Sequence, residues 1–120
     1  MKVLWFTLLG SLGFLVASAA QAEGSLLGQW RSTSEKNICN MRFKDDGSFS
    51  GDLAVSGKVV WQFAGEWTLK GTKLSYLYTR SSFDKIPAGS TDVDKLVEIE
   101  ADDYVVETTS GKLNTYFRIQ

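Results

Sequence analysis

The fold is decided by residues 39–67, which read CNMRFKDDGSFSGDLAVSGKVVWQFAGEW. Apolar and polar residues alternate on both sides of Asp45-Asp46-Gly47, and this period of two is typical of antiparallel strands with one buried face. A three-residue hairpin loop with Gly47 in the left-handed position sets Phe43 opposite Phe49. A two-residue loop would set apolar side chains opposite polar ones, so the three-residue loop is predicted.

A second hairpin in this stretch turns at residues 56–58, and we predict an odd number of connecting residues there too. This register sets Phe49 opposite Gly65 and Gly51 opposite Phe63, so each glycine receives an aromatic ring from the neighbouring strand. Alternating large and small side chains fill a narrow barrel interior. The same register pairs Leu53 with Trp61 and Val55 with Val59.

The alternation continues through the rest of the chain, on both sides of these hairpins. Eight short strands are expected, at residues 28–32, 38–44, 48–55, 59–70, 72–80, 94–101, 104–109 and 112–119. Two-residue turns at Lys70-Gly71, Asp102-Asp103 and Ser110-Gly111 set Trp67 opposite Leu74, Val97 opposite Thr108 and Tyr104 opposite Phe117. The pattern predicts an all-β fold with a single antiparallel up-and-down barrel.

The first 22 residues carry the three parts of a secretory signal peptide. Lys2 supplies the basic start, residues 3–16 form the apolar run, and Ala20-Gln21-Ala22 has the small-x-small form that signal peptidase recognises. We expect a cleavable signal peptide over 1–22, helical in form, and a barrel domain over 23–120. The apolar run is shorter than the roughly 20 residues of a bilayer span, so no stable membrane anchor is expected. The product is expected in the periplasm or outside the cell.

The composition argues for binding and against catalysis. Without residues 1–22 the chain has 12 basic and 14 acidic residues, which is no electrostatic footprint for nucleic acid. There is no histidine, the commonest general base and metal ligand. Cys39 is the only cysteine and alternates onto the apolar face, which predicts an inert thiol, while a disulfide to another chain stays open. We expect no enzyme, no metal site and no cofactor.

The domain opens with Leu26-Leu27-Gly28-Gln29-Trp30, which places Gly-x-Trp at the start of the first strand. With FKDDGSF at residues 43–49 and GEWTL at residues 65–69, this series resembles the bacterial lipocalin-like domains of the calycin group. The resemblance implies a small up-and-down barrel that binds an apolar ligand. The chain is shorter than a typical lipocalin and lacks its helix after the barrel. Avidins also begin with Gly-x-Trp, but their later Trp-bearing strands have no counterpart here, so biotin binding is not inferred.

The resemblance also implies structural roles for Gly28, Trp30 and Arg118. In lipocalins the tryptophan of the first strand lies across the closed barrel end, under an arginine from near the last strand. Alternation puts Arg118 on the face opposite Phe117 and Ile119, which suits packing over that end. The alternative, an exposed Arg118 on a terminal strand, stays open.

Side chains of the expected inner face are the candidate ligand-binding residues. They line an apolar pocket at the open barrel end, or they fill the barrel, because eight strands enclose just enough space for side chains or one small ligand. Buried phenol groups also need hydrogen-bond partners. The candidates are Met41, Trp61, Phe63, Trp67, Tyr76 and Tyr78.

The connection over residues 81–93 is the longest in the domain and holds Pro87, the only proline. Long loops in compact domains are often functional, so Phe83, Lys85 and Ile86 are candidate partner-binding residues.

The sequence leaves two functions open. The first is an exported, non-enzymatic binder of a small apolar ligand at the barrel mouth. The second is a protein-binding module, such as an inhibitor of an extracytoplasmic hydrolase, with a filled barrel and this loop as the contact.

Overall fold

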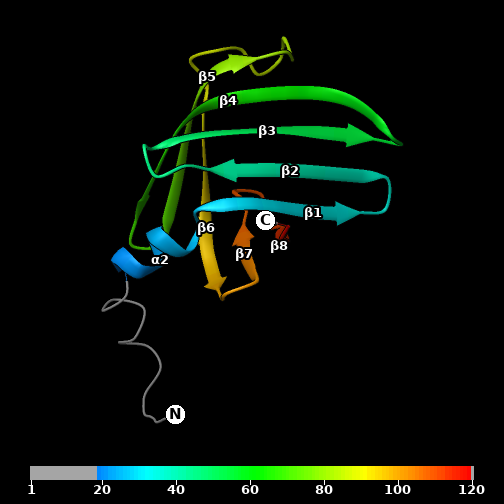
Figure 1. Cartoon of the computed structure of the whole chain (residues 1–120). Coiled ribbons are helices and arrows are strands. Elements are labelled where there is room, and N and C mark those ends of the chain that lie inside the picture. Colours follow the sequence, from blue (N-terminus) through cyan, green and yellow to red (C-terminus); the bar gives the residue numbers. More distant parts are fainter. Residues whose placement is uncertain (1–18, 120) are drawn as a thin grey trace.

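The structure is a computed structural model that describes the backbone of residues 19–119 and the side chains of residues 22–119. Eight antiparallel strands close into a barrel in sequence order, which confirms the predicted all-β, up-and-down architecture (Figure 1). Residues 1–18 of the expected signal peptide lie outside the described residues. The elements are α2 (Ala19–Ser25), β1 (Gly28–Ser34), β2 (Asn37–Phe43), β3 (Ser48–Val55), β4 (Lys58–Lys70), β5 (Lys73–Ser81), β6 (Thr91–Ile99), β7 (Asp103–Glu107) and β8 (Leu113–Arg118).

The β2–β3 hairpin has the predicted loop and register. Phe43 pairs with Phe49, and Gly47 is left-handed, at a φ of 87°. The Asp46 carboxylate accepts hydrogen bonds from the backbone N–H and the hydroxyl of Ser48, at 2.9 and 2.6 Å. Aspartate and glycine therefore hold this turn by local bonding and by backbone freedom.

The β3–β4 turn differs from the prediction. Only Ser56 and Gly57 connect the strands, both with positive φ (52° and 82°), so Val55 pairs with Lys58 and not with Val59. A bulge in β4 then restores the predicted pairs nearer the core, among them Leu53 with Trp61. Two left-handed residues suit the twist of a two-residue hairpin, and the bulge absorbs the one-residue difference.

The β4–β5 turn also lies one residue later than predicted, at Gly71-Thr72. Trp67 consequently pairs with Tyr76 and not with Leu74. Gly71, with a φ of 61°, occupies the first turn position, where a left-handed residue is needed. Because each partner moves by two residues, the predicted inner face is kept.

At the β7–β8 hairpin the prediction is wrong by one residue, which reverses a face. The turn has three residues ending at left-handed Gly111, so Tyr104 pairs with Tyr116 and not with Phe117. The Tyr104 and Tyr116 rings stack at 4.8 Å, whereas Phe117 is 55% exposed.

The β6–β7 turn is displaced by one position, as at β4–β5, so Ile99 pairs with Tyr104 and not with Val106. Glu100 N–H bonds to the Asp103 carbonyl, so the turn lies at residues 101–102 and not at 102–103. A bulge between Leu96 and Glu98 then turns Val97 outward and buries Leu96.

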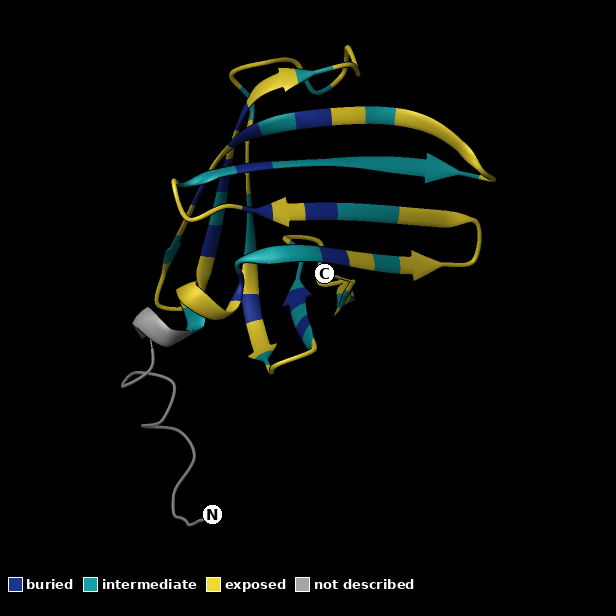
Figure 2. Cartoon of the chain, viewed as in Figure 1, coloured by how far each residue is buried: buried dark blue, intermediate teal, exposed yellow. Residues whose placement is uncertain are grey.

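Apolar and aromatic side chains fill the barrel interior. Buried and exposed residues alternate along β4 and β5 (Figure 2). The predicted interleaving of rings and glycines is present, because a Cβ on Gly51 would come within 2.6 Å of the Phe63 ring. Within residues 19–119, no helix has the length and apolar character to cross a membrane. The core comprises Leu26, Trp30, Met41, Phe43, Phe49, Phe63, Trp67, Leu74, Tyr76, Tyr78, Leu96, Tyr104 and Val106.

Candidate functional site

One barrel end is closed by Trp30 and Arg118. Trp30 is fully buried, and its indole N–H donates to the Leu26 carbonyl at 2.8 Å. The Arg118 guanidinium carbon lies 4.1 Å from the centroid of the Trp30 ring. This is a cation–π contact, and its position beside a fully buried indole gives it a packing role.

Arg118 also bonds three separate segments together. Its guanidinium donates to the carbonyls of Ser25, Leu27 and Ala101, at 2.8, 2.9 and 2.8 Å. The end of α2 is therefore attached to the β6–β7 turn, and Gly28, at a φ of 121°, turns the chain from α2 into β1. With its donors engaged, this end is a structural closure.

Away from this closure, Trp61 packs with Tyr78 and Phe83 on the inner face, which it shares with Cys39 and Asp94. We call this group of Cys39, Trp61, Tyr78, Phe83 and Asp94 the mouth. Trp61 is half-buried, and its indole N–H donates to Ser81 Oγ at 2.8 Å. Its ring centroid lies 4.4 Å from that of Phe63 and 5.4 Å from that of Tyr78.

The other sequence-predicted ligand residues lie deeper than Trp61. All of them share the inner face but are at most 7% exposed. Trp67 belongs to the closed half, where its ring packs on Phe43 at 5.0 Å. Trp61 is thus the candidate that a bound molecule would reach directly. The deeper set is Met41, Phe63, Trp67, Tyr76 and Tyr78.

The β5–β6 connection covers residues 82–90, because β6 begins at Thr91 and not at Asp94 as predicted. Its candidate partner-binding residues separate. The Phe83 ring, 41% exposed, lies 6.5 Å from the Trp61 ring, and Ile86 packs against the core. Lys85 is exposed. The apolar side chains of this loop therefore lean toward the barrel.

The inner wall also carries polar residues that the sequence reading missed. Tyr76 donates to Asp94 Oδ2 at 3.0 Å, and Tyr116 donates to Cys39 Sγ at 3.7 Å. The Tyr104 hydroxyl is buried without a hydrogen-bond partner. The sequence pattern predicts Asp94 at a strand start and Tyr116 on an outer face. The sequence signal for an inward-facing Asp94 is its spacing of two residues from Leu96, because residues two apart share one face of a strand.

Burial sets the protonation of these groups. It raises the pKa values of the Cys39 thiol and of the Tyr76 and Tyr116 phenols, so all three stay protonated near neutral pH. Burial also raises the pKa of Asp94, while the bond from Tyr76 opposes that shift and the negative charge of Asp92 adds to it. The thiol and phenol groups of the mouth are therefore protonated and weakly nucleophilic, and the carboxyl group of Asp94 lies beside them.

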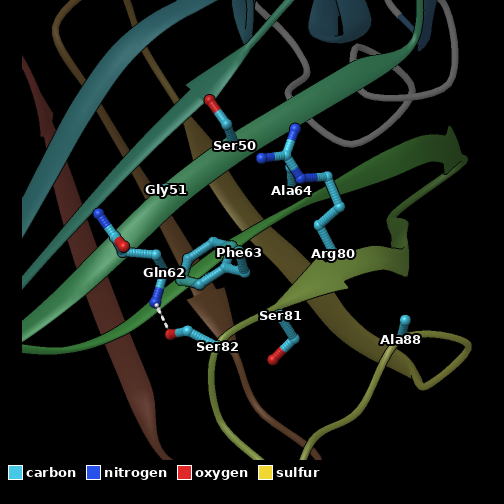
Figure 3. Close-up of a pocket in the computed structure, with 9 residues that line it drawn as sticks. All are labelled: Ser50, Gly51, Gln62, Phe63, Ala64, Arg80, Ser81, Ser82 and Ala88. Carbon is cyan, nitrogen blue, oxygen red and sulfur yellow. Dashed lines mark hydrogen bonds between the residues drawn. The ribbon is translucent and has the colours of Figure 1, made fainter.

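Outside the barrel, a cavity of about 710 Å³ lies between β3–β5 and the following loop (Figure 3). The Gln62 backbone N–H donates to Ser82 Oγ at 2.8 Å beside it. Of the sequence-predicted residues only Phe63 contributes to this cavity, and its other side chains are small or polar. It is lined by Ser50, Gly51, Gln62, Phe63, Ala64, Arg80, Ser81, Ser82 and Ala88.

Among the described residues, one group of three carboxylates is close enough to share a cation. Glu98, Glu100 and Asp103 place carboxylate oxygens within 4.8 Å of one another at the β6–β7 turn. Glu98 and Glu100 are exposed, and Asp103 Oδ1 is buried without a hydrogen bond. The group lies at the closed end, away from the mouth.

The structure is similar to a crystal structure of a lipocalin-like protein from Bacteroides uniformis. The TM-score is 0.58 at 18% sequence identity, over 80% of this chain and 100% of that chain. No protein-family model and no curated protein matches the sequence. The chain therefore has the fold of a lipocalin-like small β-barrel protein, as its Gly-x-Trp opening suggested.

Proposed function

We propose that this protein is a non-enzymatic binding protein that takes a small apolar ligand at the mouth, against Trp61. A half-buried indole carries the proposal: it stands above a filled barrel and packs against Phe63, Tyr78 and Phe83 at 4.4 to 6.5 Å. A concave apolar surface with a few polar groups is the usual form of a ligand site. The ligand would rest on this aromatic layer and not pass below it, because Phe49 packs beneath Phe63 and Tyr78.

The chemistry of the mouth favours binding over catalysis. Its one thiol, Cys39, faces the Tyr116 phenol and not a base, and burial raises its pKa. The alternative of a hydrolase inhibitor that binds through the β5–β6 loop has less support, because Phe83 and Ile86 turn toward the barrel. We therefore favour a small molecule over a protein partner.

Titration with Nile red, a neutral apolar dye that brightens in apolar surroundings, tests the proposal. We expect saturable binding, and Trp61→Ala is expected to weaken it about 10-fold, since truncating an aromatic anchor costs more than about 1 kcal/mol. Leu113→Ala is the control, because Leu113 is apolar but 62% exposed on the outer wall. Thermal unfolding verifies that both variants fold. Equal affinities for wild type and Trp61→Ala would refute the assignment.

We further propose that the protein is exported and acts in the periplasm or outside the cell, as residues 23–120. The small-x-small triplet ending at Ala22 supports cleavage there. The carbonyls of Ser25, Leu26 and Leu27, which hold Arg118 and Trp30, all lie beyond that point, so cleavage keeps these contacts and removes Ala22 from the edge of the core.

N-terminal sequencing of the protein from a Gram-negative host tests export. We expect a periplasmic product that begins at Glu23, and Ala20→Arg is expected to block processing, because the peptidase requires a small residue there. Recovery of the wild-type chain in the cytoplasm with Met1 in place would contradict this proposal.

A further inference from the structure

Two acidic side chains, Asp92 and Asp94, lie on the inner wall of the mouth. Leu74 pairs with Asp94 and Tyr76 pairs with Asp92, so the two aspartates share the inner face of β6. The other polar residues at this level are neutral, namely Ser32, Cys39, Ser81 and Asn114. Arg118 faces inward at the closed end, where three carbonyls hold it. Within the described residues, no lysine or arginine donates a hydrogen bond to Asp92 or Asp94. Lys58, which its register with Val55 puts on the inner face, lies at the tip of the β3–β4 hairpin.

Asp94 is the more deeply placed of the two. It is half-buried, and the neutral Tyr76 phenol donates a hydrogen bond to its carboxylate, at 3.0 Å. Taking a carboxylate out of water costs free energy unless an opposite charge or several hydrogen bonds compensate it. Asp92, the neighbouring charge, repels it further. Asp94 therefore provides a site where a cation would be stabilised and an anion rejected.

Aromatic faces lie beside these carboxylates. Tyr78 follows Tyr76 on the inner face of β5, and Tyr76 pairs with Asp92, so the Tyr78 ring neighbours Asp92 on this face. Burial raises the pKa of the Tyr78 phenol, and the charges of Asp92 and Asp94 add to that shift. The Trp61 ring lies 5.4 Å from Tyr78. Indole and phenol faces attract cations, and the attraction grows as water is excluded. The carboxylates and the aromatic rings thus both favour a positively charged ligand.

We propose that the mouth selects cationic apolar ligands, in which a protonated amine or quaternary ammonium group is carried on an apolar body. Asp94 supplies the counter-charge, and the Trp61 and Tyr78 rings pack against the cation and its alkyl groups. This inference rests on the proposed binding function and specifies the chemistry of its ligand.

Three probes with the same ten-carbon chain test the proposal by isothermal titration calorimetry at pH 7.5: decyltrimethylammonium, decanol and decanoate. We expect the cation to bind at least about 10-fold more tightly than decanol, and decanoate to bind most weakly. Asp94→Asn keeps an acceptor oxygen for Tyr76 but removes the charge. This substitution is expected to weaken binding of the cation about 10-fold and to leave the affinity for decanol within about 2-fold of wild type.

Asp52→Asn is the matched control, because Asp52 lies on the outer wall and accepts a hydrogen bond from Asn40 Nδ2 at 2.9 Å. Wild-type affinity for decanol or decanoate equal to that for the cation would overturn the inference. So would an unchanged cation preference in Asp94→Asn. Either result leaves apolar binding standing, whereas failure of all three probes to bind overturns the inference and the proposed function together. The probe series on the wild-type protein needs no variant to fold.

Discussion

Replacing Trp30 by alanine is expected to lower the free energy of unfolding by about 4 kcal/mol, near the upper end for large-to-small core substitutions. Trp30 is fully buried, meets Tyr104 edge-on at 4.8 Å, donates to the Leu26 carbonyl and supports Arg118. Its loss leaves a cavity, an unpaired carbonyl and an arginine without its ring. Urea unfolding followed by circular dichroism measures the change.

Trp61→Ala is the matched control for this prediction, because it removes the same side chain from a half-buried position. It is expected to cost about 1 to 2 kcal/mol, since less apolar area is lost from the core. Trp30→Phe keeps most of the ring and is expected to give an intermediate value, which covers the case in which the alanine variant does not fold. A smaller loss at Trp30 than at Trp61 would contradict the assignment of Trp30 to the closed end.

Replacing Gly65 by alanine is expected to destabilise the barrel by about 3 kcal/mol. A Cβ there would overlap the Leu77 carbonyl of the neighbouring strand and lie 3.0 Å from the Phe49 ring. Because the carbonyl belongs to a paired backbone, it cannot move aside without disturbing the β4–β5 ladder. The same unfolding measurement reports the effect.

Gly24→Ala serves as the control for Gly65, because a Cβ at Gly24 meets nothing within 4 Å. Gly24 precedes the strands of the barrel, so the change is expected to be close to neutral. If the two substitutions had equal effects, the close approach of β5 to Gly65 would be wrong.

Turn residues decided how much of the fold was predictable. Around Asp46-Gly47 the hydrogen bonds of the turn are local, and the predicted register holds. At the β7–β8 hairpin, Tyr116 and Phe117 are both aromatic, so hydrophobic pattern alone could not choose the inner one. The choice was made by the length of the turn that ends at Gly111. Bulges add or remove a residue without any sequence marker of their own, which is why Val97 was placed inside.

The candidate site was less predictable than the fold for a related reason. Asp94 lies next to a segment with proline, glycine and several polar residues, which is typical of a loop. The first residues of β6 nevertheless form a strand, because they pair with β5 across the barrel. Likewise, the proximity of Cys39 and Tyr116 depends on barrel closure between residues that are 77 positions apart. Contacts of this kind follow from the closed topology and not from any local pattern.

Binding at the mouth can be located by the indole N–H signals of the tryptophans in a 15N NMR spectrum during Nile red titration. The Trp61 indole donates to Ser81 at the mouth, while the Trp30 indole is fully buried at the closed end and donates to Leu26. We expect saturation to move the Trp61 signal and leave the Trp30 signal in place. A Trp30 shift with an unmoved Trp61 signal, or no shift in either, would contradict ligand binding at the mouth.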